Sequence, residues 1–196
     1  ELEKINICND ILQNARNELY LSMRFFDVIL SKMEYMPKPD VEGFATDGYY
    51  LYYYPDYVLG MYQRDAVKVN RSYLHMVFHC LFDHLNRPED EVEPYWDLAC
   101  DIVVESIIDS LQKRSVRAYI TPYRKNIYHS LQKEMDVLTP KGVYRVLEAM
   151  NLDMAELAKM RLEFWVDNHE NWNKNVPPEQ QIERQNQWKD LNEKLQ

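Results

Sequence analysis

Three of the five histidines in this 196-residue chain, His75, His79 and His84, lie within one ten-residue stretch. His75 and His79 are four residues apart, so on a helix they share a face and lie one turn from each other. Two imidazoles in this arrangement can bind one metal ion. The residues around them are mainly apolar, and burying two imidazoles without partners is costly. The spacing leaves two interpretations open, a metal site or a pair of histidines packed and hydrogen-bonded in the core.

The residue after His75 limits the chemistry that a metal site here could perform. Zinc peptidases with the motif H-E-x-x-H carry a glutamate at this position, which takes a proton from zinc-bound water and passes it to the leaving amine. In this chain the position is Met76, whose thioether can do neither. Removing a general base typically slows a reaction by about 10²–10⁴-fold. The histidines can still bind metal, because the glutamate is not a ligand in the motif.

Two residues are candidates for a third ligand. His84 follows His75 by nine residues, which is about half a turn round a regular helix. It can join the same metal only if the helix breaks or tightens after Phe82, and otherwise it would hydrogen-bond a ligand or cap the helix. Asp101 lies in the next predicted helix, and two histidines with a carboxylate from another helix form a recurrent zinc site. The sequence does not choose between them.

Several carboxylates could replace the missing base. Glu105 is one turn beyond Asp101 and could be a ligand, a base or a solvated charge. Asp83 and Asp101 are the other two, and nothing in the sequence places any of the three beside the histidines. No catalytic residue is therefore assigned.

The elements that would position these residues are mainly helical. Apolar residues surround most of residues 64–86, which predicts a deeply buried central helix that ends at Asn86-Arg87-Pro88. The apolar spacing also predicts helices over residues 2–35 and 95–113. Shorter helices are expected further along, over residues 143–150, 154–166 and 179–196.

A small β region precedes the central helix. Asp47-Gly48 lies between short β-prone runs, which is a strong hairpin signal. The tyrosine-rich run from Tyr49 to Tyr54 then predicts a strand with one packed face. The alternative is an edge strand bordering a cleft, to which an extended peptide could add. Helices with one hairpin predict a predominantly helical α+β fold.

Composition excludes several function classes. A net charge of −9 argues against nucleic acid as a partner. There is no signal peptide and no run of about 18 apolar residues, so no membrane segment is expected. The cysteines are odd in number and have apolar neighbours, which predicts reduced buried thiols in a cytoplasmic protein. They are Cys8, Cys80 and Cys100.

The domain organisation follows from the two ends of the chain. We expect a piece of a longer protein, because the chain begins at Glu1 and not at Met. Residues 1–172 are predicted to form one domain. The run from Asn173 to Pro178 has the composition of a linker, so residues 173–196 are predicted to be a linker and helical tail leading toward a further C-terminal region.

Several weak motifs occur in a fixed order. They are Asp47-Gly48, then Tyr54-Pro55-Asp56, then Tyr73-Leu74-His75-x-x-x-His79-x-x-x-x-His84-Leu-x-Arg87, then Trp96-Asp-Leu-Ala99-Cys-Asp101-Ile-x-x-Glu105. This run resembles the metallopeptidase domain found ahead of a von Willebrand factor A-like domain in bacterial proteins. That family usually reads H-E-x-x-H-x-x-x-x-H-x-x-R and then W-x-x-A-x-D-x-x-x-N. Asp167-Asn-His169-x-x-Trp172 resembles its closing region.

The resemblance implies a zincin-like fold, with a small sheet beside a zinc-binding helix, and a von Willebrand factor A-like domain as a C-terminal partner. Two departures matter, Met76 for the glutamate and Glu105 for the asparagine. They imply a metallopeptidase-related domain with lost or strongly impaired peptidase activity, which binds or scaffolds a peptide or protein. An active peptidase with a relocated base and a metal-free helical interaction domain are the alternatives.

The two remaining histidines carry weaker signals. His129 is predicted to lie on the surface of a short helix. His169 belongs to the family-like closing region, but it fits an exposed residue at a helix end equally well.

Overall fold

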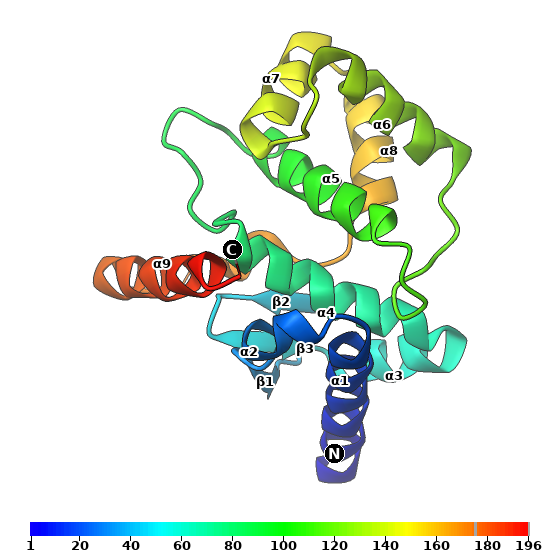
Figure 1. Ribbon diagram of the computed structural model, residues 1–196, viewed down its shortest axis with the longest axis vertical. Coiled ribbons are helices and arrows are strands. Elements are labelled where there is room, and N and C mark those ends of the chain that lie inside the picture. The colour runs from blue at the N-terminus through cyan, green and yellow to red at the C-terminus, as the bar shows by residue number, and fades with distance from the viewer. Residues whose placement is uncertain (175, 196) are drawn as a thin grey trace. The chain divides into compact units, whose positions relative to one another are not determined.

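The computed structural model describes residues 1–174 and 176–195 and has the predicted, predominantly helical α+β fold (Figure 1). Asn175 and Gln196, in the predicted linker and tail, lie outside the described residues. The chain divides into two compact units. The first comprises Glu1–Asn86, Gln112–Arg117 and Val166–Gln196, and the second comprises Arg87–Leu111 and Ala118–Trp165.

The first unit begins with α1 (Leu2–Ser22), η1 (Arg24–Phe26) and α2 (Asp27–Leu30). The prediction of one helix over residues 2–35 is therefore wrong. The backbone leaves the helical region at Met23, where φ is −145°. This bend lets Met23, Ile29 and Leu30 all bury their side chains, and it releases the following residues to form a strand.

The sheet of the first unit has three strands in the order β1-β3-β2, namely β1 (Glu34–Pro37), β2 (Phe44–Thr46) and β3 (Tyr50–Tyr53). β3 pairs parallel with β1 and antiparallel with β2. The predicted hairpin is confirmed, with Gly48 at φ +85° and Asp47 Oδ1 accepting from the backbone nitrogens of Tyr49 and Tyr50. The alternative of a tyrosine-rich edge strand is wrong, because β3 is the central strand.

Two helices follow the sheet, α3 (Pro55–Arg64) and α4 (Ala66–Leu81). The predicted central helix over residues 64–86 is confirmed in its middle, but it is shorter at both ends. Asp65 caps α4 by accepting a hydrogen bond from the backbone nitrogen of Val67. Every residue from Val69 to Leu81 is buried, so α4 is the core of the first unit.

The predicted helical tail is α9 (Pro178–Glu193), and it belongs to the first unit. α9 lies beside the C-terminal end of α4 (Figure 1). Arg184 and Trp188 are its buried side chains. Trp188 Nε1 donates to the carbonyl oxygen of Gly48 at 2.9 Å, so the tail packs against the hairpin turn.

The second unit contains α5 (Tyr95–Ser110), α6 (Pro122–Glu134), α7 (Pro140–Met150) and α8 (Met154–Phe164). Prolines begin α6 and α7, and Asp153 begins α8 with a capping box. Arg124 on α6 is the polar centre of this unit. Its side chain lies within 3.3 Å of carboxylate oxygens on three residues of the same unit, Glu105, Asp109 and Glu163.

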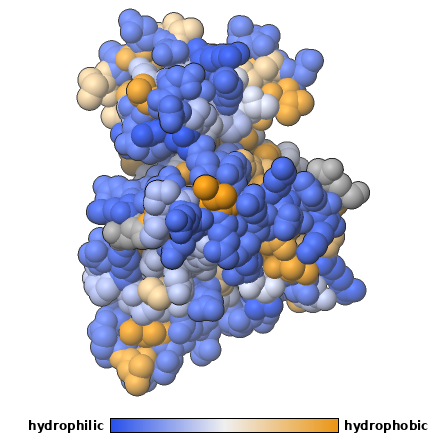
Figure 2. All heavy atoms as spheres, turned by 90° about the vertical axis from the view of Figure 1, so that its left-hand side faces the viewer, coloured by the Kyte–Doolittle hydropathy of each residue, from blue (hydrophilic) through white to orange (hydrophobic). Residues whose placement is uncertain are grey.

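The surface is largely hydrophilic on the face drawn in Figure 2, where hydrophobic atoms form separate small groups. Among the described residues, every helix is too short or too polar to cross a membrane. The three cysteines are buried free thiols, as predicted.

Candidate metal centre

Four side chains of the first unit point their ligand atoms at one another. His75 and His79 are fully buried on α4, and their Nε2 atoms are 2.7 Å apart. Asp167 Oδ1 lies 3.3 Å from His75 Nε2, 3.8 Å from His79 Nε2 and 3.2 Å from His169 Nε2. We call His75, His79, Asp167 and His169 the donor cluster. Its ligand atoms all lie within 4.8 Å of one another.

The sheet positions the half of the donor cluster that α4 does not carry. Asp167 and His169 come from residues 166–172, here called the closing segment. The backbone nitrogen of Asn168 donates to the carbonyl oxygen of Phe44 at 2.7 Å, and Asn168 forms a parallel bridge with Ala45 on β2. Neighbouring side chains of an extended chain point to opposite sides, so Asp167 and His169 point to the same side and Asn168 to the other.

Stacking and hydrogen bonds fix the other end of the closing segment. The short helix η2 (His169–Asn171) leads to Trp172, whose ring stacks on His169 with centroids 3.9 Å apart. Arg184 of α9 donates to the carbonyl oxygen of Trp172 at 2.7 Å and to Asn173 Oδ1 at 2.9 Å. The closing segment is thus held between the sheet and α9.

The end of α4 determines where His84 lies. Asp83 has a left-handed backbone with φ +63°, and the backbone nitrogen of His84 donates to the carbonyl oxygen of His79 at 2.9 Å. This is the Schellman pattern of a helix C-terminus. It folds the His84 ring back, so that Nδ1 of His84 is 3.0 Å from Nδ1 of His79. His84 therefore contacts the nitrogen of His79 that faces away from the donor cluster.

The electrostatics of the donor cluster suit a cation. Burial alone would raise the pKa of the Asp167 carboxyl, but His169, His75 and His79 hold that pKa well below its usual range. Asp167 is therefore a buried carboxylate. Its Oδ2 atom is buried and accepts no hydrogen bond from any residue that the structure describes. Imidazole nitrogens and a carboxylate are ligands that zinc commonly takes, so these residues fit a metal ion.

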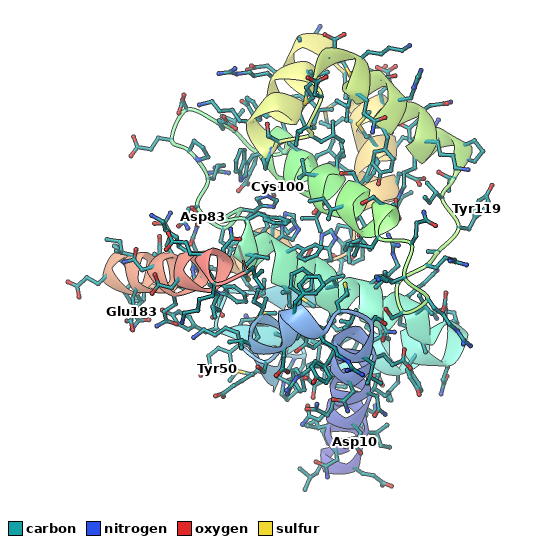
Figure 3. All side chains as sticks on the ribbon, in the orientation of Figure 1. Asp10, Tyr50, Asp83, Cys100, Tyr119 and Glu183 are labelled. Atoms are coloured by element: carbon teal, nitrogen blue, oxygen red, sulfur yellow. The ribbon has the colours of Figure 1, made fainter. Side chains whose placement is uncertain are left out.

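The other candidate residues are buried or held by hydrogen bonds. Asp101 and Glu105 are buried on α5 in the second unit, where Glu105 accepts from Arg124 Nη1 at 2.8 Å. Asp83 is exposed at the end of α4, near α9 (Figure 3), and accepts hydrogen bonds from Asn86 and Gln185. Met76 is fully buried on α4. Ligation by Asp101 or His84 stays a prediction.

The predictions for His129 and His169 differ in how they compare with the structure. His129 is exposed on α6, as predicted. The interpretation of His169 as an exposed helix-end residue is wrong, because its side chain is only 7% exposed. Asp167 was not foreseen as a member of the site. The signal available in the sequence was the Asp-x-His spacing before Trp172, but spacing alone does not bring this segment to α4.

Comparison with known families supports a metal-related role. A family model described as "putative metallopeptidase domain" matches residues 9–156, most of the chain. The matched residues include His75, Met76 and His79, whereas Asp167 and His169 follow the end of the match. Comparisons with curated proteins and with solved structures gave no match.

Proposed function

Because the chain belongs to this metallopeptidase-domain family, we propose that it is a zincin-like, metal-binding domain with lost or strongly impaired peptidase activity. It acts as a binding or scaffold module for a peptide or protein. The observation that carries this proposal is the donor cluster, with Met76 at the position where the family's glutamate is expected.

The donor cluster supplies the metal-binding half of the proposal. His75 and His79 would hold the ion from α4, together with donors from the closing segment. The ion would be zinc, since imidazole nitrogens and a carboxylate are its common ligands. A bound zinc ion would supply a Lewis acid. Asp101 or His84 as the third ligand is the alternative, and the zinc affinities of their alanine variants test each of them.

The second half of the proposal is the missing base. Met76 can neither accept nor donate a proton. Glu105 is paired with Arg124, and Asp83 accepts hydrogen bonds at an exposed helix end. These interactions favour impaired activity over an active peptidase with a relocated base.

The partners follow from the family resemblance and from charge. We propose a C-terminal von Willebrand factor A-like domain in the full-length bacterial protein, a cytoplasmic location and a peptide or protein partner. The net charge of −9 disfavours nucleic acid.

A zinc analysis combined with a peptidase assay tests this proposal. The purified protein should contain one zinc per chain and hydrolyse neither casein nor a peptide mixture. His75→Ala should lose the zinc, and His129→Ala, which removes an exposed histidine outside the site, should keep it. Robust zinc-dependent cleavage would establish the active-peptidase alternative instead.

A thermal-shift measurement separates the proposal from the metal-free interaction domain. Zinc at 100 times its dissociation constant stabilises a protein by about 2.7 kcal/mol if it binds only the folded state. We expect such a shift in the wild type and none in His75→Ala. A protein that is purified without metal and is not stabilised by zinc would be the metal-free domain.

A further inference from the structure

We infer that the metal ion is held by all four side chains of the donor cluster at once and that it works as a structural clasp, tying the closing segment to α4. This inference rests on the proposed function, since it concerns the same metal. It adds that the coordination is complete within the protein and that two of the four ligands lie beyond the residues that match the family.

The geometry of the donors carries the first step. Asp167 Oδ1 is within 3.8 Å of Nε2 of each of the three histidines, and the Nε2 atoms of His75 and His79 are 2.7 Å apart. Three imidazoles and one carboxylate therefore share one point. Structural zinc sites almost always have four protein ligands, whereas catalytic sites have three and leave a position for water or substrate. A four-donor set of this kind is the structural type.

Burial carries the second step. His75, His79 and Asp167 have no exposed side-chain surface, and the side chain of His169 is 7% exposed. Asp167 Oδ2 is buried without a hydrogen bond from the described residues, which is costly unless a cation compensates it. A metal ion bound to Asp167 would provide that compensation.

The two pairs of donors are far apart in sequence, so a shared ion would join distant parts of the chain. Two donors lie on α4 and two on the closing segment, and the whole second unit lies between them in sequence. The closing segment leads directly to α9. An ion that joins α4 to the closing segment closes a long loop, so its binding energy contributes to folding. The metal thereby helps to hold α9 on the first unit.

Met76 is a separate observation that agrees with a structural metal ion. A peptidase needs both a general base and an open coordination position. The sequence removes the base, and four protein donors would occupy the position.

Zinc affinity and cobalt spectra test the coordination. The wild type, loaded with Co²⁺, should show the intense visible bands of a four-coordinate tetrahedral ion. His169→Phe keeps an aromatic ring against Trp172 but has no nitrogen donor. Its zinc affinity should fall by more than about 100-fold, because loss of a mere outer-shell partner already costs 10–100-fold. His169→Ala should behave alike, and His129→Ala is the matched control.

Hydrogen exchange tests the clasp. Zinc should slow amide exchange in the closing segment and α9 of the wild type, and a chelator should reverse this. In His169→Phe at the same zinc concentration the protection should be absent. Circular dichroism of the metal-free variants shows whether each one still folds like the metal-free wild type.

The outcomes separate the two proposals. Tight zinc binding that is equal in the wild type, His169→Phe and His169→Ala would overturn the clasp and leave the proposed function standing. A six-coordinate cobalt spectrum in the wild type would do the same. Absence of zinc binding in the wild type would overturn both proposals.

Discussion

At the scale of single residues, His79 uses both of its ring nitrogens. Nε2 faces the donor cluster, and Nδ1 is 3.0 Å from Nδ1 of His84. A neutral imidazole has one donor and one acceptor nitrogen. If Nε2 of His79 gives its lone pair to a metal, Nδ1 carries the proton and donates to His84. The hydrogen bond then fixes the tautomers of His79 and His84 together, and His84 orients the ring of His79 toward the metal.

His84→Ala should therefore weaken zinc binding by about 10–100-fold, the usual cost of losing a hydrogen-bond partner behind a metal-bound histidine. His84→Asn offers a carbonyl oxygen as acceptor and should recover part of the loss. Isothermal titration with zinc measures both. Equal affinities for the wild type and His84→Ala would show that His84 has no orienting role.

Met76→Glu tests whether the base is the only missing part. With all four donors on the ion, a new glutamate has no water to act on, so peptide hydrolysis should stay at the wild-type background. Met76→Glu combined with His169→Ala restores a base and opens a position, and at a zinc concentration high enough to load this variant hydrolysis should rise by about 10²-fold or more. Activity from Met76→Glu alone would contradict four-donor coordination.

At the scale of elements, the end of α4 does more than stop a helix. Its Schellman turn places His84 behind His79, and this turn needs a left-handed residue at position 83. Asp83 supplies it without glycine, and Gln185 and Asn86 hold its carboxylate. A regular helix through residue 86 would instead carry His84 to another face.

Substitutions of Asp83 should separate backbone strain from side-chain contacts. Asp83→Gly relieves the strain of a left-handed backbone at this position, but it also removes the exposed hydrogen bonds of the Asp83 carboxylate. The two effects oppose each other, so the unfolding free energy should stay within about 0.5 kcal/mol of wild type. Asp83→Val should lose about 1–2 kcal/mol or more, because a β-branched residue disfavours this conformation. Urea unfolding followed by circular dichroism measures both. Equal stability of the two variants would exclude strain at this turn.

Buried groups on β3 and α4 predict an alkaline limit to stability. Burial raises the pKa of Tyr53 and of Cys80 to about 12 each. The unfolded values are about 10 and 8.5, so the folded state binds these protons more tightly. Their contribution is complete below pH about 8.5 and is lost as pH rises to about 12. Unfolding free energies measured from pH 8 to 11 should fall, and Tyr53→Phe should lessen the fall above pH about 10.

The elements also show which parts of the fold a sequence can predict. α4, α5 and the hairpin follow from apolar spacing and from Asp47-Gly48, because local pattern and burial agree there. The break at Met23 does not, since the apolar stripe continues across it, whereas the bend goes together with burial of Met23 and pairing of β1 with β3. His75 and His79 were predictable as neighbours on one helix. Asp167 was not, because its position depends on a backbone bridge to a strand far away in sequence.

At the scale of the whole molecule, Arg184 joins three segments of the first unit. It is 1% exposed and donates to the carbonyl oxygens of Asp47 and Trp172 and to Asn173 Oδ1. Its side chain passes so close to Gly48 that a Cβ there would lie 2.5 Å from Arg184 Cδ. The polar composition of residues 173–196 suggested a linker and tail, yet these contacts make α9 part of the packed unit.

Arg184→Ala should lower the unfolding free energy by about 3 kcal/mol or more, because it leaves the two buried carbonyl oxygens of Asp47 and Trp172 without this donor. Ile182→Ala, on the same helix at a position that is 60% exposed, should change it by less than about 0.5 kcal/mol. The melting temperatures of the two variants, measured by thermal unfolding, are compared. Similar melting temperatures would mean that α9 does not contribute to the stability of the first unit.

The two halves of the donor cluster are synthesised at different times, because the second unit lies between them in sequence. α4 is complete at Leu81, but the closing segment follows only after residues 87–111 and 118–165. During synthesis, a growing chain therefore presents His75 and His79 to the cell long before Asp167 and His169 leave the ribosome. Metal loading by all four side chains must wait until the closing segment has been made, so it would report that synthesis has passed His169 and that the closing segment has folded onto α4.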